Sequence, residues 1–190
     1  MSASANSDVV ADEDLPRIAA ITADPVRLGG ATAVERSISE LLRVVREVLD
    51  LEVVFIGEFV EGRRIFRHVS ATQADAIIKA GESHPLDLTL CSRIVEGGFP
   101  AVAQDVRGLV DLHGLPPMFQ GMGGHIGVPV RYDDGTLYGM LCGFSTKACP
   151  QLHERDLKRL EIAAQTTARL LAQAAGHDVT GSLVEPACPA

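Results

Sequence analysis

Two runs of apolar and aromatic residues, separated by a tight-turn sequence, constrain this chain more than any other feature. The runs are HIGVPVRY at 125–132 and LYGMLCGFS at 137–145, and Asp133-Asp134-Gly135-Thr136 lies between them. Gly135 tolerates the positive φ that a tight turn requires, so the runs are predicted to pair as a hairpin. The fold must therefore contain antiparallel strands.

A second hairpin is predicted earlier in the chain. Residues 52–60 (EVVFIGEFV) are rich in β-branched and aromatic residues, and 63–70 (RRIFRHVS) alternate polar and apolar residues after Glu61-Gly62. Between the two hairpins the pattern predicts short helices over 72–80 and 91–96, and one strand over 101–104.

Amphipathic helices are predicted at both ends of this β-rich region. Residues 33–49 carry apolar positions at helical spacing, and Thr32 with Glu35 suggests a capping box at the start. A shorter helix is possible around 18–21. Residues 153–175 form a longer helix with a seam of the kind that pairs helices, made of Leu157, Leu160, Ala164, Thr167 and Leu171.

No strand-helix-strand alternation occurs in this order of elements. The fold class is therefore predicted as α+β, with a mostly antiparallel sheet covered by helices, and a doubly wound parallel sheet is disfavoured. A chain of 190 residues fits one domain. We assign it to residues 15–175, with an acidic disordered tail over 1–14 and a flexible tail over 176–190.

Composition excludes several classes of partner. The net charge of -8 and the pI near 5.2 argue against a partner that is nucleic acid or an anionic membrane. The N-terminus lacks the features of a signal peptide, and no apolar stretch approaches the roughly 20 residues that span a bilayer. The four cysteines form no CxxC pair. A reduced, cytoplasmic protein is expected.

Four blocks of sequence together resemble a GAF sensory domain, of the type associated with GGDEF/EAL signalling proteins and with stand-alone bacterial GAF proteins. The resemblance covers about residues 33–173. It rests on the order and spacing of VLDLEVVFIGEFVEGRRIFRHV, LDLTLCSRIVEGGFPAVAQDV, GGHIGVPVRYDDGTLYGMLCGFS and LHERDLKRLEIAA.

The resemblance implies a fold and a general role. It implies a central antiparallel sheet of about six strands, with the terminal helices on one face and a small-molecule pocket under short helices on the other. It also implies a homodimer through the terminal helices. The family's usual Tyr is Leu90 here, and its cyclic-nucleotide signature is missing, so no cyclic-GMP site is assigned. Ser92 follows Cys91 where bilin-attaching domains have His, which argues against a covalent bilin.

The candidate ligand-binding residues are expected to converge between the helix at 91–96 and the loop at 105–124. Glycines at 121, 123 and 124 suggest a flexible lid over this pocket. Each candidate also has a plainer interpretation: a buried hydrophobe, a histidine with an ordinary partner, a loop-capping carboxylate or a solvated basic patch. The candidates are Cys91, Asp105, Phe119, His125 and Cys142, and an anion site at Arg63, Arg64 and Arg67 is a weaker possibility.

The chemistry of these candidates leaves three functions open. No Ser-His-Asp ordering, paired carboxylates or metal spacing predicts an enzyme, so the leading interpretation is a cytosolic small-molecule sensor without its own output domain. Its cofactor is undefined, and His125 could ligate a haem. The second is a redox sensor or a free-methionine-sulfoxide-reductase-like enzyme using Cys91, with Cys142 as redox partner. The third is a dimerisation scaffold.

Overall fold

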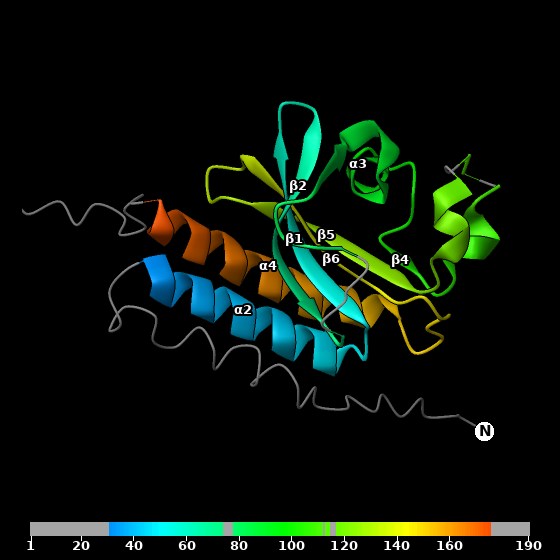
Figure 1. Ribbon diagram of the computed structural model, residues 1–190, viewed down its shortest axis with the longest axis horizontal. Helices are drawn as coiled ribbons and strands as arrows, with labels where there is room; N and C mark the ends of the chain where they lie inside the picture. Colours follow the sequence, from blue (N-terminus) through cyan, green and yellow to red (C-terminus); the bar gives the residue numbers. More distant parts are fainter. Residues whose placement is uncertain (1–30, 74–77, 112, 115–116, 176–190) are drawn as a thin grey trace, which may run out of the picture.

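The computed structural model describes residues 31–73, 78–111, 113–114 and 117–175 (Figure 1). These residues form one sheet with long helices on one side and short helices on the other. The tails predicted at 1–14 and 176–190, the helix near 18–21 and the middle of segment 72–80 lie outside the described residues, so those predictions stay untested.

The sheet has six strands, and all of its pairings are antiparallel. The strand order is β3-β2-β1-β6-β5-β4. The prediction of an α+β fold with about six antiparallel strands is therefore confirmed. The strands are β1 (Val53–Val60), β2 (Arg63–Ala71), β3 (Ser83–Pro85), β4 (Val102–Ala103), β5 (His125–Arg131) and β6 (Leu137–Phe144).

Both predicted hairpins are present, as β1-β2 and β5-β6. Gly135 has a φ of 84°, the left-handed conformation that the turn sequence predicted. The sequence analysis missed β3, whose three residues pair with the start of β2. A strand this short has no alternation to detect.

A bulge in β2 determines which of its side chains face the same way. Phe55 pairs with Val69 and Gly57 pairs with Phe66, so one extra residue of β2 is accommodated between these pairs. Phe66 and Val69 consequently share one face of the sheet, and Arg64 lies on that face because it is two residues from Phe66.

The helices α2 (Ala31–Val48) and α4 (Glu154–Ala174) lie side by side on one face of the sheet, as Figure 1 shows. They enclose the largest hydrophobic core, which includes Leu41, Val54 and Leu141. Both helices agree with the predicted ranges. The helix starts earlier than the cap predicted at Thr32, because α2 begins at Ala31 and Thr32 lies inside its first turn.

The seam predicted on α4 packs within the chain itself. Leu160, Ala164 and Thr167 are buried and belong to the face of α4 that contacts α2 and β5. A charge at Leu160 would therefore disrupt the core of a single protomer, and it is not a probe of contacts between copies.

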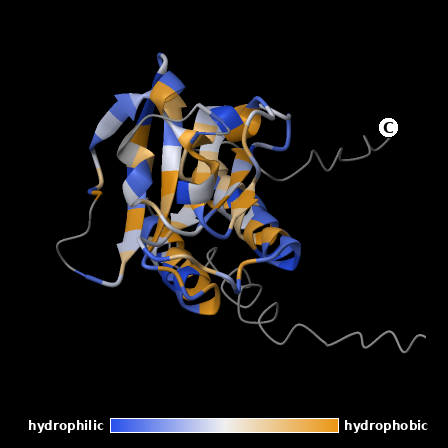
Figure 2. Ribbon diagram, turned by 90° about the vertical axis from the view of Figure 1, so that its right-hand side faces the viewer, coloured by the Kyte–Doolittle hydropathy of each residue, from blue (hydrophilic) through white to orange (hydrophobic). Residues whose placement is uncertain are grey.

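Short helices cover the opposite face of the sheet. They are α3 (Leu90–Val95) and the 3-10 helices η1 (Leu86–Leu88), η2 (Val106–Leu109) and η3 (Pro117–Gly121). Figure 2 shows hydrophobic residues running through the middle of the sheet and alternating with hydrophilic ones along the helices. No helix within the described ranges is long and apolar enough to cross a membrane.

Candidate functional site

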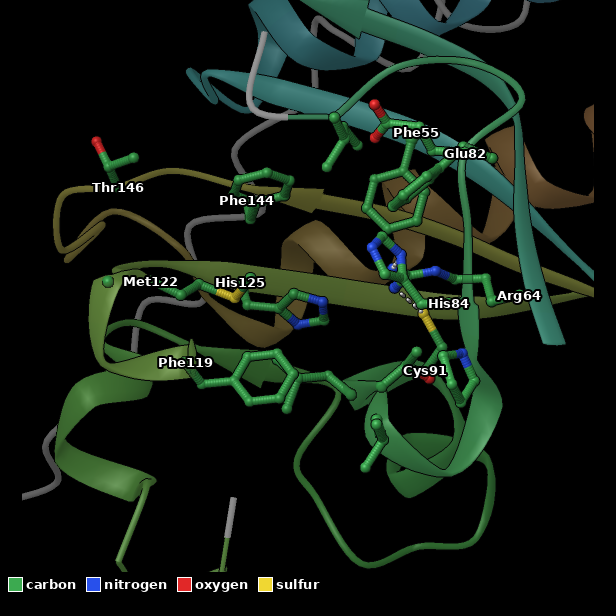
Figure 3. Close-up of a pocket in the computed structure, with 17 residues that line it drawn as sticks. Phe55, Arg64, Glu82, His84, Cys91, Phe119, Met122, His125, Phe144 and Thr146 are labelled. Atoms are coloured by element: carbon green, nitrogen blue, oxygen red, sulfur yellow. Dashed lines mark hydrogen bonds between the residues drawn. The ribbon is translucent and has the colours of Figure 1, made fainter. Parts of the chain in front are cut away.

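A cavity of about 470 Å³ lies between the sheet and the segments β3, η1, α3 and η3 (Figure 3). This volume falls in the range of small-molecule sites. The sheet supplies the floor and the short helices supply the walls. The lining residues are Phe55, Arg64, Phe66, Ile78, Glu82, His84, Pro85, Leu88, Thr89, Leu90, Cys91, Phe119, Gly121, Met122, His125, Phe144 and Thr146.

Four phenylalanines make the cavity largely aromatic. Phe55 and Phe66 meet edge to face with ring centroids 4.8 Å apart, and Phe55 lies 6.4 Å from Phe144 in the same manner. Phe119 approaches from η3 on the other side of the cavity. These rings present both faces and edges to the space, a surface suited to a flat apolar group.

Arg64 reaches the cavity because β1 carries a glycine beside it. A Cβ at Gly57 would lie 2.8 Å from Cγ and 2.9 Å from Cδ of Arg64, so only glycine leaves this path open. The guanidinium stacks over the ring of Phe66, with Cζ 4.2 Å from the ring centroid. It donates from Nη2 to Nδ1 of His84 at 3.0 Å and from Nη1 to Sγ of Cys91 at 3.5 Å.

The charge of Arg64 is not balanced by a carboxylate. Across the described part of the chain no acidic side chain lies within ion-pair distance of its guanidinium, and Nε is buried without a hydrogen-bond partner. Glu82 also lines the cavity, but it is exposed and accepts from the backbone amide of Lys79. The cavity therefore has a positive inner end.

Cys91 and Cys142 form a buried pair of thiols behind this end. Their Sγ atoms are 3.7 Å apart, and neither is in a disulfide. The hydrogen bond from Cys142 and the nearby charge of Arg64 lower the pKa of Cys91 to about 6 despite its burial. Burial, with the neighbouring Cys91, raises the pKa of Cys142 well above its usual value. Cys91 therefore ionises first.

His125 forms part of the cavity wall from the first position of β5. It is 2% exposed, and its Nδ1 atom is buried without a hydrogen-bond partner. Burial lowers the pKa of His125 to about 3, with a smaller effect from Arg64, so the ring is neutral at physiological pH. A neutral imidazole has one N–H donor and one nitrogen acceptor. In this structure Nδ1 of His125 neither donates nor accepts a hydrogen bond.

The structure brings together most of the residues that the sequence singled out. Cys91, Phe119 and His125 line the cavity, and Cys142 lies directly behind Cys91. Asp105 does not line it. Its carboxylate is exposed, accepts from the backbone amide of Arg107 at the start of η2 and pairs with the Arg107 side chain at 2.8 Å. It fits the plainer interpretation, a loop-capping carboxylate.

Two of the predicted lid glycines are needed for close packing. A Cβ at Gly123 would collide with the backbone of Lys147, and one at Gly124 with the side chain of Cys149. Both backbone amides donate hydrogen bonds, to Ser145 and Lys147 respectively. The prediction that these positions form a flexible lid is therefore wrong.

Sequence reasoning missed the polar end of the site. It treated Arg64 as part of a surface patch with Arg63 and Arg67, whereas the structure places Arg64 in the cavity and leaves Arg63 exposed. The signal was the alternation in β2, which puts Arg64 on the face of Phe66. His84 was missed because β3 was missed. Among the described residues no cluster of His, Cys, Asp or Glu could hold a metal ion.

Comparison with solved structures finds the same fold in proteins of different activities. The GAF domain of an Acinetobacter phosphoenolpyruvate-protein phosphotransferase is 16% identical, with a TM-score of 0.63 over 90% of this chain and 95% of that one. A free methionine-R-sulfoxide reductase from Neisseria meningitidis, solved with its substrate, is 17% identical, with a TM-score of 0.65 over 93% and 96%.

A phycoerythrobilin-bound GAF domain from a cyanobacterial phytochrome is also 17% identical, with a TM-score of 0.57 over 91% of this chain and 98% of that one. At such identities these likenesses show the fold alone. A comparison with curated proteins finds no match. The family model of the GAF domain matches residues 31–172, about three quarters of the chain, and the chain therefore belongs to the GAF domain family.

Proposed function

We propose that this chain is a small-molecule sensor whose ligand occupies the cavity between the sheet and the segments β3, η1, α3 and η3. The ligand would contact Cys91, Phe119 and His125, with Cys142 behind the first of these. Occupancy would pass through the sheet to α2 and α4 on its other face.

The observation that carries the proposal is the state of His125. A buried polar atom without a partner costs about 1–3 kcal/mol, so proteins rarely leave one without a reason. Here the unpartnered Nδ1 belongs to a 2% exposed side chain on the wall of a cavity of about 470 Å³. A ligand that bonds this ring would remove the penalty. A dimerisation scaffold requires no such cavity.

Native mass spectrometry of freshly purified protein, followed by a thermal-shift screen of chemically diverse small molecules, tests the proposal. We expect a ligand that raises Tm for the wild-type protein and fails to do so for Met122→Trp, which fills the cavity. Val95→Trp, an exposed position on α3 outside the cavity, is the matched control and should respond like wild type. Ligands that bind both tryptophan variants equally would place the site elsewhere.

A second candidate function, thiol redox chemistry, is favoured by the pairing of Cys91 with Cys142. Sulfur atoms 3.7 Å apart need only a small movement to reach the roughly 2.05 Å of a disulfide. The ionised Cys91 is the nucleophile that such chemistry requires. With a hydroperoxide, two thiols would give a disulfide, an alcohol and water. With free methionine sulfoxide they would give a disulfide, methionine and water.

Intact-mass analysis after exposure to each oxidant tests this second candidate. We expect the mass of the wild-type protein to fall by that of two hydrogens as the disulfide forms. Cys142→Ser should show no such change. Cys149→Ser, which removes a buried cysteine outside the pair, should react like wild type. If thiol counts stay unchanged with both oxidants, Cys91 and Cys142 are packing residues.

Three further features of the role stay predictions. These are a homodimer through the terminal helices α2 and α4, a cytoplasmic location, and a signalling protein as partner. Sedimentation equilibrium at high protein concentration tests the dimer, and a protein that is monomeric there would contradict it.

A further inference from the structure

We propose that the cavity binds a small organic anion with an aromatic body, whose anionic group takes over the Arg64 guanidinium that now contacts the Cys91 thiol. This inference rests on the proposed function, because it names the chemical class of the ligand for the same cavity. It also predicts that ligand binding and the ionisation of Cys91 oppose each other.

The first argument is the unbalanced charge. Cations in a partly enclosed site are usually paired, since removing an ion from water costs several kcal/mol. Arg64 donates only to His84 and Cys91, and its buried Nε has no partner in the region that the structure describes. A guanidinium has five N–H donors in a planar fork that matches a carboxylate or phosphate. Unused donors therefore remain for an anion.

The surroundings of the Arg64 side chain direct its guanidinium into the cavity. Gly57 leaves the space through which the side chain crosses β1, and the ring of Phe66 supports one face of the guanidinium. Arg63, the neighbouring residue, instead bonds Ser83 at the surface. One arginine of the pair is thus directed inward and the other outward.

The second argument is the surface next to this charge. Phe55, Phe66, Phe119 and Phe144 line the cavity, and they surround a space large enough for a ring. Aromatic side chains favour edge-to-face and offset contacts with another ring. His125, neutral and with Nδ1 unpartnered, can add one hydrogen bond to a polar substituent on the body.

The third argument concerns Cys91, which shares Arg64 with the incoming anion. Sγ of Cys91 lies 3.5 Å from Nη1 of Arg64. An anion bound to the guanidinium places a negative charge close to Sγ, and this charge favours the protonated thiol over the thiolate. Linkage is reciprocal, so the thiolate must weaken anion binding by the same factor.

The other titratable groups around the cavity are His125, His84, Glu82 and Cys142. Burial lowers the pKa of His125 to about 3, below the range of the measurement. Burial and the charge of Arg64 lower the pKa of His84, whose Nδ1 accepts from the guanidinium, and the Cys91→Ser variant separates its effect from that of the thiol. Glu82 is exposed at the rim. Cys142 ionises only after Cys91.

Calorimetric titration with four probes tests the inference. Phenylacetate and phenyl phosphate carry the anion on a ring, phenylacetamide carries the ring alone, and inorganic phosphate carries the charge alone. We expect one or both ring anions to bind at least about tenfold more tightly than phenylacetamide, as charge-assisted hydrogen bonds imply. The better of the two identifies the anionic group. Arg64→Gln should remove this difference, and Arg63→Gln should keep it.

A pH series supplies a second readout that does not depend on the Arg64 variant being well folded. Between pH 5.5 and pH 8 the Kd of phenylacetate, which is ionised throughout this range, should rise several-fold for the wild-type protein. The rise should be clearly smaller for Cys91→Ser, which cannot ionise in this range.

Each failure has a separate meaning. Equal binding of phenylacetate and phenylacetamide, or full binding by a folded Arg64→Gln protein, would overturn the anion while leaving the ligand pocket intact. Absence of binding by all four probes would also overturn the aromatic-anion class, and the diverse screen described above then decides the proposed function on its own. A Kd that is independent of pH for the wild-type protein would overturn the coupling to Cys91.

Discussion

The two faces of the sheet are built from alternate residues of the same strands, yet they differ in kind. Along β6, Leu141 points into the core under α2 and α4, and its neighbours Met140 and Cys142 point to the other face. The helix-side core consists almost entirely of aliphatic side chains and alanine. The pocket-side clusters contain phenylalanine, methionine and cysteine, and they border a cavity with buried polar atoms.

This difference separates the part of the chain that supplies most of its stability from the part that contains the candidate site. The helix face is a filled interior that is almost entirely apolar, with the buried Thr167, whose Oγ1 has no hydrogen-bond partner, as an exception. The pocket face leaves a cavity of about 470 Å³, an unbalanced guanidinium and an unpartnered imidazole, all of which oppose stability. Such departures are typical of functional sites.

The largest loss of stability is expected from a substitution in the helix-side core. Leu141→Ala should lower the free energy of unfolding by about 3 kcal/mol, because it opens a hole in a core where this side chain is fully buried. Leu88→Ala, the same truncation at the exposed rim of the cavity, should stay within about 0.5 kcal/mol of wild type. Urea denaturation of both variants measures the contrast, and similar losses at both sites would contradict it.

The second prediction tests the pocket face through the pH dependence of the free energy of unfolding. The folded protein holds the pKa of His125 near 3, whereas the unfolded chain titrates near the usual value of about 6.5. Between these values the unfolded state binds a proton that the folded state does not. The free energy of unfolding is therefore highest above pH 6.5 and decreases as the pH falls below it. At pH 5 the titration of His125 lowers the free energy of unfolding by about 2 kcal/mol.

His125→Gln removes this titration. Urea denaturation at pH 7.5 and pH 5 should therefore show a smaller acid-induced loss of stability for the variant than for the wild-type protein. If both proteins lose the same amount, His125 is not held neutral by the pocket.

The third effect concerns the thiol pair on the pocket face. Cys142→Ala removes the hydrogen bond that contributes most to the low pKa of Cys91, and should raise that pKa from about 6 by about one unit, worth about 1.4 kcal/mol. Arg64→Gln should also raise it, because the variant removes both the charge and the hydrogen bond of the guanidinium. Rates of Cys91 alkylation against pH measure both shifts, and an unchanged pKa in Cys142→Ala would contradict the role of that hydrogen bond.

The smallest effect is expected outside both faces. Asp105→Ala should cost at most about 1 kcal/mol, since it removes an exposed cap and an exposed ion pair at η2. It should leave ligand binding in the cavity unchanged. A marked loss of affinity in calorimetry would return Asp105 to the binding site.

The sequence was informative where local chemistry decides structure. The turn Asp133–Thr136 predicted the β5-β6 hairpin, and helical spacing predicted α2 and α4 to within about two residues at each end. The positions of Cys91, Phe119 and His125 around one space also followed from the sequence, because the resemblance supplied the order of the elements. Local patterns and family topology together were sufficient for this much.

The rest depended on register and packing, which short patterns do not reveal. Alternation in RRIFRHVS puts Arg64 on the face of Phe66, but the bulge that aligns this face with Val69 and the glycine at 57 that leaves room for the Arg64 side chain have no signature in that segment. Asp105 looked equivalent to a pocket carboxylate until its pairing with Arg107 was seen. The glycines at 123 and 124 looked flexible, whereas close contacts with the 147–149 segment require them.

The pairing of β1 with β6 has a consequence for how the molecule folds. Val53 pairs with Phe144, so the centre of the sheet joins segments about ninety residues apart, whereas β1-β2 and β5-β6 are local. Non-local pairings of this kind slow folding, because loop closure must precede the contact. Phe55 and Arg64 lie in the first half of the chain and His125 and Phe144 in the second, so the cavity exists only after the halves have joined. A ligand of this cavity would therefore bind the native state selectively and stabilise the whole domain.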